Sequence, residues 1–402
     1  MQTLGDATDV ELVTLLEPLA VAYAEWLKRQ TERLEARDNG LEHHQKAGKE
    51  LLGRAEEARK RIADGIALLA ESKEARDAFR FANRAMALQR AHTLWSEHRR
   101  RGGSDDLESF EVPELRSWYP FQLAFILLNL PSITDPTHPE RSDPTQAACD
   151  VLWYPTGGGK TEAYLGLSAY VLGLRRLQGT LGGRRGDAGV AVLMRYTLRV
   201  LTLQQFQRAA SLVCACEVLR REDPERWGEE PFRIGLWVGQ ATTPNKIDIA
   251  AEALKNLHGD TWHKTGSGRP DQLSACPWCG TSIDPAVHMK VETYEKGRAR
   301  VLTYCGDKLG TCAFSQRVSP GEGIPVLTVD EEIFRRLPAV LIGTVDKFAQ
   351  LPWNGATETL FGVVDGRCER HGFRTPTLKD TDSHPATDSL PAAASFSDPP
   401  IW

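Results

Sequence analysis

Long apolar runs are missing from this sequence. No stretch of about 18 consecutive apolar residues occurs among its 402 residues, so no membrane-spanning helix is expected. The first residues, MQTLGDATDVELV, are acidic and lack the positive charge pattern of a secretory signal. Cysteines are few, and half of the eight occur in paired spacing that suits a metal better than disulfides. A reducing cytoplasm is therefore the expected compartment.

A strong excess of one charge is also missing. The formal net charge is -5, which argues against wholesale coating of nucleic acid but leaves room for a local basic groove. Hydrophobic residues make up 41% of the chain, an ordinary fraction for a globular protein, and the length suffices for two or three domains. No internal repeat is found.

The apolar spacing changes near residue 105, which predicts a domain boundary there. From Val10 to about Arg101, apolar residues recur at helical spacing, so residues 1–105 are predicted to form a helical hairpin or bundle. The segment RRRGGSDD breaks this pattern. Residues 106–402 are predicted to form an α/β domain with a zinc-ribbon insertion at about 258–325 and a flexible segment at about 374–400.

Strands alternate with helices after this boundary, which predicts an open, mostly parallel sheet. The expected strands are Cys149–Tyr154, Gly189–Tyr196, Phe232–Gly239 and Ala339–Thr344. The expected helices between them are Thr161–Leu177 and Thr197–Arg221.

Three glycines and a Lys-Thr pair lie between the first expected strand and its helix. The strict phosphate-loop pattern fails because Tyr154 stands where its first glycine belongs. The remainder is intact: Pro155, Thr156, Gly157, Gly158, Gly159, Lys160 and Thr161. Glycines let consecutive N–H groups turn toward phosphate oxygens, and the helix N-terminus adds positive partial charge. Lys160 is expected to reach the β- and γ-phosphates of ATP and Thr161 to hold Mg²⁺, which makes them the candidate catalytic residues. The alternative is a mobile glycine-rich turn.

A loop of the form Pro-Thr-Gly-x-Gly-Lys-Thr resembles that of superfamily 2 helicases and translocases. Upstream, Gln122 in WYPFQLAFILLNL resembles the glutamine motif, in which the side chain reads adenine; a plain helix residue is the alternative. Downstream, RYTLRVLTLQQFQRA resembles motif Ia through Thr197, Arg199, Leu201 and Gln204. A helix-capping threonine beside an arginine suits contact with a strand phosphate. Tyr196 stands where that family has proline, and a helix start with one surface arginine is the alternative.

A third segment, VLIGTVDKFAQL, resembles the motif Ib region that contacts the nucleic-acid backbone, through Gly343 and Thr344. In combination, these motifs and a zinc knuckle between them resemble the helicase-like DrmA family of the bacterial DISARM anti-phage system, from roughly Phe79 onward. The resemblance implies a RecA-like sheet, ATP and Mg²⁺ as cofactors, single-stranded DNA as ligand and a DrmB-like DISARM subunit as partner. Members of that family are considerably longer than this chain.

The knuckle CPWCG supplies Cys276 and Cys279, and TYCGDKLGTC supplies Cys305 and Cys312. Four thiolates close a tetrahedral structural Zn²⁺ site with no open position for chemistry. Cys312 is the least secure ligand because it lies seven residues after Cys305. A redox pair of the first two cysteines is the alternative.

The other cysteines are interpreted differently. Cys368 and His371 have metal spacing but need a further ligand such as His384. Cys214, Cys216 and Cys149 are interpreted as core residues.

A carboxylate pair of the Asp-Glu-x-His type, which a superfamily 2 motor needs to orient Mg²⁺ and water, is missing after Thr344. The segment TVDEEIF precedes the Gly343-Thr344 motif and reads as a charged helix start. The chain is therefore expected to be the N-terminal, ATP- and DNA-binding part of a motor. The alternatives are a non-catalytic scaffold that binds nucleotide and a partner, and a phosphate-loop kinase, which would leave the helicase-like motifs without a role.

Overall fold

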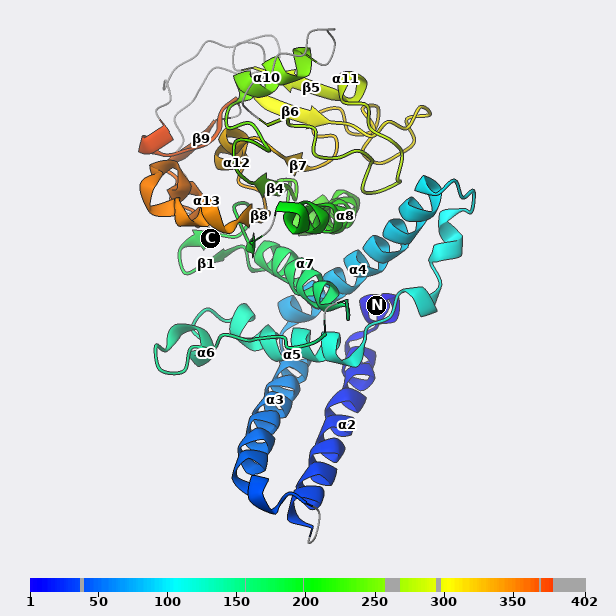
Figure 1. Ribbon diagram of the computed structural model, residues 1–402, viewed down its shortest axis with the longest axis vertical. Helices are drawn as coiled ribbons and strands as arrows, with labels where there is room; N and C mark the ends of the chain where they lie inside the picture. The colour runs from blue at the N-terminus through cyan, green and yellow to red at the C-terminus, as the bar shows by residue number, and fades with distance from the viewer. Residues whose placement is uncertain are drawn as a thin grey trace. The chain divides into compact units, whose positions relative to one another are not determined.

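The computed structural model describes residues 1–36, 40–155, 157–197, 199–256, 268–293, 298–368 and 370–378 (Figure 1). The chain divides into two compact units. Unit 1 comprises Met1–Arg84 and Arg116–Leu174, and unit 2 comprises Ala85–Leu115 and Arg175–Trp402. Thr156, His384 and nearly all of the predicted flexible segment lie outside the described residues. No described helix is long and apolar enough to cross a membrane.

Unit 1 is helical. Its helices are α1 (Gln2–Asp6), α2 (Asp9–Glu35), α3 (Gln45–Glu71), the first part of α4 (Lys73–Arg100), α5 (Pro120–Thr134), α6 (Pro139–Ser142) and most of α7 (Lys160–Gln178). Thr8 begins α2 with a capping box, in which its side chain and that of Glu11 each accept from the other's backbone N–H. Helices α2 and α3 run side by side (Figure 1).

Close packing in unit 1 explains one glycine. A Cβ atom at Gly65 on α3 would lie 2.1 Å from the carbonyl oxygen of Leu127 on α5. The two helix backbones therefore approach each other as closely as they do only because position 65 has no side chain. The assignment of residues 1–105 to a single domain stays a prediction.

Unit 2 contains a four-stranded parallel sheet in the order β3-β8-β4-β7. These strands are β3 (Val192–Tyr196), β8 (Val340–Thr344), β4 (Ile234–Trp237) and β7 (Val326–Leu327). β4 and β8 are fully buried, as expected for strands inside a parallel sheet. The associated helices are α8 (Arg199–Glu222), α9 (Pro224–Trp227), α12 (Asp330–Arg336) and α13 (Val345–Ala349). A mixed α/β fold with a parallel sheet is thus confirmed.

Short antiparallel pairs complete unit 2. They are β1 (Thr180–Leu181) with β2 (Arg184–Arg185), β5 (Met289–Glu292) with β6 (Arg300–Thr303), and β9 (Gly366–Cys368) with β10 (Gly372–Arg374). Helices α10 (Ile247–Lys255) and α11 (Pro285–His288) flank the β5–β6 pair. Apolar residues of α10, β5 and β6 form one small core with Val329.

The strand expected at Cys149–Tyr154 is wrong. These residues form neither helix nor strand; Val151 and Trp153 are exposed, and so is Cys149, which was expected in the core. A short apolar run does not by itself identify a hydrogen-bonded neighbour, and a strand needs one. The segment belongs to unit 1, whereas the four-stranded sheet belongs to unit 2.

Candidate functional site

The glycine loop of unit 1 leads directly into α7. Gly157 and Gly159 adopt positive φ angles of +83° and +86°, a conformation that side chains oppose. Lys160 begins the helix and folds back over the loop, where its Nζ donates to the carbonyl oxygens of Tyr154 and Pro155. Thr161 follows in the first helical turn. Loop glycines, a helix N-terminus and one lysine are thus gathered within a few residues, an arrangement that suits a phosphate group.

Gln122 belongs to this loop site. Its side chain is only 2% exposed, and its Nε2 donates to the carbonyl oxygen of Gly159 at 2.7 Å. Its Oε1 accepts from the backbone N–H of Tyr119 at 2.9 Å, which caps α5. The residue therefore fixes the glycine loop to the start of α5. The expectation of contact with adenine stays a prediction.

Two aromatic residues of the site escaped the sequence analysis. Phe121 stacks on Tyr154 with ring centroids 4.0 Å apart, and Tyr119 stacks on Phe121 with ring centroids 6.1 Å apart. Tyr154 occupies the place of the missing first glycine, and a Cβ atom at Gly158 would lie 2.5 Å from its ring. The departure from the phosphate-loop pattern was the available signal, because an aromatic residue at that position needs a partner.

In unit 2, two of the predicted DNA-binding segments meet at one sheet edge. Tyr196 pairs with Thr344 across the parallel β3–β8 ladder, so Thr197 follows β3 where Gly343 and Thr344 end β8. Thr197 is exposed, whereas Thr344 is buried and precedes α13. Arg199 begins α8, and nothing is described of its side chain. Gln204 lies on the same helix and is exposed.

A buried ion pair supports the same edge. Lys347 of α13 donates to Asp330 at the start of α12, and both side chains are about 10% exposed. Burial raises the pKa of Asp330, although the charge of Lys347 opposes that rise. The ring centroid of Trp237 lies 5.8 Å from the Lys347 ammonium. The segment TVDEEIF does start a helix, as predicted, but the side chain of Asp330, its first acidic residue, is buried.

The four predicted metal ligands converge. The sulfur atoms of Cys276, Cys279, Cys305 and Cys312 are buried and lie within 4.8 Å of one another. The Cys279–Cys305 and Cys276–Cys312 sulfur pairs are 3.3 and 4.0 Å apart. Zn–S bonds of about 2.3 Å in a tetrahedron imply sulfur separations of about 3.8 Å, so the quartet could hold a metal such as zinc. Among the described residues, it is the one group of Cys, His, Asp and Glu that fits a metal.

Asp307 explains how the widely spaced Cys312 reaches this quartet. Its carboxylate accepts from the backbone N–H groups of Leu309, Thr311 and Cys312, at 3.1, 2.7 and 2.9 Å. Three such bonds close the loop between the last two cysteines. This aspartate was not singled out in the sequence, although an Asp two residues after a ligand is a common turn signal.

Within unit 2, the knuckle packs on the second part of α4. The ring of Trp278 stacks on His92 with centroids 3.3 Å apart, and its carbonyl oxygen is 2.8 Å from His92 Nδ1. Arg99 donates to the carbonyl oxygen of Cys279 at 2.8 Å. The metal site is therefore tied to a long helix rather than to the sheet alone.

The remaining cysteines differ from one another. Cys214 and Cys216 are fully buried in α8, as predicted, and burial raises their pKa. Nothing is described of the Cys368 side chain, so the second metal site stays untested with His371 and His384.

Comparison with known proteins gives one family. No protein-family model matches the sequence. The chain is 41% identical over 327 residues to the DISARM protein DrmA of Bacillus paralicheniformis, which covers 81% of this chain and 28% of that protein. The chain thus spans less than a third of its relative's length. Over these 327 residues, the resemblance to the DISARM protein DrmA that the motifs indicate is confirmed.

Proposed function

We propose that this chain is the ATP- and DNA-binding part of a superfamily 2 helicase or translocase in a bacterial DISARM phage-defence system. The similarity to DrmA supports the system. The observation that carries the biochemical proposal is the glycine loop, in which Lys160 rests on the carbonyl oxygens of Tyr154 and Pro155. Among the described residues, two carbonyl oxygens hold this lysine, and it can exchange them for phosphate oxygens, which carry the stronger negative charge.

In this proposal, Lys160 and the N–H groups of Gly157, Gly158 and Gly159 hold the β- and γ-phosphates of ATP. Thr161 supplies a hydroxyl to Mg²⁺, and Gln122 keeps the loop in place through Gly159. Bound Mg-ATP would supply the phosphoryl chemistry. Thr156, Pro155 and a RecA-like arrangement of the sheet belong to the same proposal.

DNA binding is proposed for the sheet edge of unit 2. Thr197, Arg199 and Gln204 would contact one stretch of the DNA backbone. Gly343 and Thr344 would contact the neighbouring stretch of the same DNA strand. Their common position at the carboxyl ends of β3 and β8 supports this assignment. Contacts to phosphates make such binding strongly dependent on salt.

A structural Zn²⁺ in the cysteine quartet, a DrmB-like DISARM subunit as partner and a cytoplasmic location complete the proposal. The sequence offers no Asp-Glu-x-His motif after Thr344, so we expect the 402-residue chain to bind ATP and single-stranded DNA without rapid hydrolysis. A scaffold that uses nucleotide only as a structural ligand is the alternative, and it predicts no DNA binding at the β3–β8 edge.

The test is calorimetric titration of Mg-ATP into the chain and its Lys160→Ala variant. Loss of the lysine charge should weaken binding by about a hundredfold or more, since a charge-assisted contact to phosphate is removed. Lys290→Ala, which removes a surface lysine paired with Glu292, is the matched control. Equal ATP affinity in the Lys160 variant would remove the basis of the proposal.

A further inference from the structure

Unit 2 contains a cavity that the proposed function leaves unused. Its volume is about 810 Å³, within the range of sites for nucleotide-sized molecules. Seven arginines line it: Arg220, Arg221, Arg233, Arg298, Arg300, Arg336 and Arg367. Arg233 directly precedes β4, and Arg336 ends α12 just before β8 begins. The cavity therefore lies at the amino ends of the parallel strands, opposite the edge where Thr197 and Thr344 lie.

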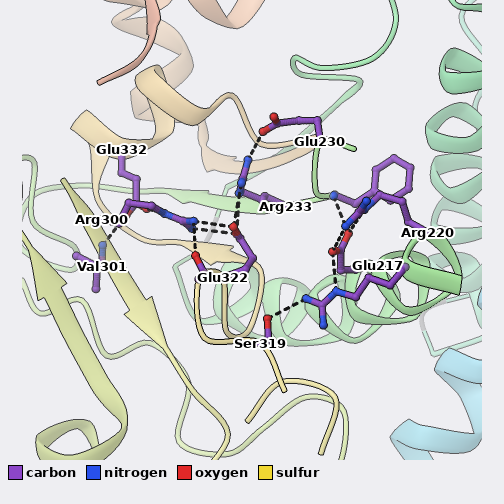
Figure 2. A network of polar contacts seen from close by, with 12 residues as sticks. Glu217, Arg220, Glu230, Arg233, Arg300, Val301, Ser319, Glu322 and Glu332 are labelled. Carbon is purple, nitrogen blue, oxygen red and sulfur yellow. Dashed lines mark hydrogen bonds and ion pairs between the residues drawn. The ribbon is translucent and has the colours of Figure 1, made fainter. Parts of the chain in front are cut away.

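The acidic residues around this cavity already form ion pairs with its arginines (Figure 2). Glu217 pairs with Arg220 and Arg221 at 2.8 and 2.9 Å. Glu230 pairs with Arg233 and Arg367.

Glu322 pairs with Arg233 and Arg300, at 2.7 and 2.6 Å, and Glu332 pairs with Arg300 at 3.0 Å. These four carboxylates pair with five of the lining arginines, which are Arg220, Arg221, Arg233, Arg300 and Arg367, whereas Arg336 pairs with none of them. A network that served only to tie the insertion to the sheet would be expected to balance its charges, because unpaired buried charge is costly.

Arg336 is the clearest example of a positive charge in this network that no described carboxylate balances. It is 9% exposed, and its Nη2 donates to the carbonyl oxygens of Arg298 and Arg370. Its Nε is buried without a partner, and no carboxylate among the described residues pairs with it. Burial, together with the charges of Arg300 and Arg233, lowers the pKa of Arg336 to about 9. The cavity wall therefore contains a buried guanidinium whose Nε has no partner and that forms no ion pair with a described carboxylate.

We propose that this cavity binds a small molecule that carries two or more phosphate groups. Guanidinium groups match phosphate oxygens in pairs, and several converging arginines favour a polyanion over a single carboxylate. Inorganic polyphosphates and nucleoside polyphosphates share this chemistry. The site is independent of the proposed ATP loop, since the loop belongs to unit 1 and the cavity to unit 2.

The test is titration of inorganic tripolyphosphate into the full chain carrying Lys160→Ala, so that the glycine loop does not contribute. One binding site per chain should remain, and adding Arg336→Met should weaken it by at least about tenfold. Arg335→Met is the matched control, because this neighbouring arginine is equally buried on α12 but does not line the cavity. It should change the affinity by less than about twofold, as expected for a residue outside the site.

Folding is checked by thermal unfolding in phosphate-free buffer, where Arg336→Met should match or exceed the parent because it removes an unpaired buried charge. Arg221→Met, at a less buried lining position, gives a second variant if Arg336→Met does not fold. Competition by ATP would identify nucleoside polyphosphates as the ligand, and its failure inorganic polyphosphate. The proposal is overturned if tripolyphosphate does not bind, if both folded lining variants bind it as the parent does, or if only single-stranded DNA binds with this arginine dependence.

Discussion

Gln122 shows how one side chain organises the nucleotide loop. Its two polar atoms satisfy the N–H of Tyr119 and the carbonyl of Gly159, and both bonds form in a buried position. Gln122→Met keeps the volume but leaves both backbone groups unpaired. The free energy of unfolding should fall by about 1–3 kcal/mol, the usual cost of unsatisfied buried groups.

The same substitution should weaken Mg-ATP binding, because the loop then loses its attachment to α5. Chemical denaturation and calorimetric titration measure the two effects. Gln146→Met provides the control, since Gln146 is exposed and contacts Asp143 instead. Full stability and ATP affinity in Gln122→Met would mean that Gln122 does not hold the loop.

At the scale of elements, the loop between Cys305 and Cys312 depends on Asp307. Asp307→Ala removes the acceptor of three backbone N–H groups, so the loop should open and Cys312 should leave the quartet part of the time. We expect metal affinity to fall by about 10- to 100-fold, as for other residues that orient metal ligands. Competition with a chromophoric chelator measures it.

Asp284→Ala is the control for this variant, because Asp284 caps α11 in the same insertion without contacting the metal loop. Equal zinc affinity in the two variants would contradict the role of Asp307.

Metal removal should act on the insertion and leave the sheet intact. One zinc per chain is expected, and chelation should speed hydrogen exchange in residues 276–312, where the bound metal closes the fold. The backbone amides of β3, β4 and β8 should keep their protection, since their ladder does not include the quartet. Uniform loss of protection across unit 2, or an absence of zinc in the purified chain, would refute this prediction.

The elements that could be predicted from sequence share a physical property. β3, β4 and β8 are apolar runs long enough to be recognised, and the helices have clear apolar periodicity. β7 was missed because its ladder involves only Val326 and Leu327. The Cys149–Tyr154 strand was wrong because apolar composition does not specify a pairing partner. The cysteine quartet was predictable from spacing, but the role of Asp307 depends on a local fold that spacing does not reveal.

At the scale of the whole chain, the arginine–glutamate network joins segments of unit 2 that are far apart in sequence. Glu230 contacts Arg367 across 137 positions, and Arg233 contacts Glu322 across 89. Such bonds form only when the complete unit has folded. A change in the protonation of the network should therefore change the free energy of unfolding of unit 2 as a whole, rather than the stability of one helix or hairpin.

Acid should destabilise unit 2 through this network. Burial tends to raise the pKa of Glu230, but Arg233 and Arg367 outweigh it and lower this pKa to about 2, against the usual 4.5. A lowered carboxyl pKa contributes stability that is present above pH 4.5 and is lost as the pH falls toward 2. The shift corresponds to about 3 kcal/mol. The pKa values of Asp330 and Glu332 are raised by burial, so these two act in the opposite direction.

Glu230→Gln isolates the contribution of this one carboxylate. The variant should be less stable than the parent at neutral pH, and its unfolding free energy should fall less steeply below pH 4.5 because one linked proton is missing. Denaturant unfolding at a series of pH values measures the slope. Glu229→Gln, at the exposed neighbouring position, should retain the parental profile. A slope in Glu230→Gln equal to that of Glu229→Gln would show that the Glu230 ion pairs do not couple protonation to folding.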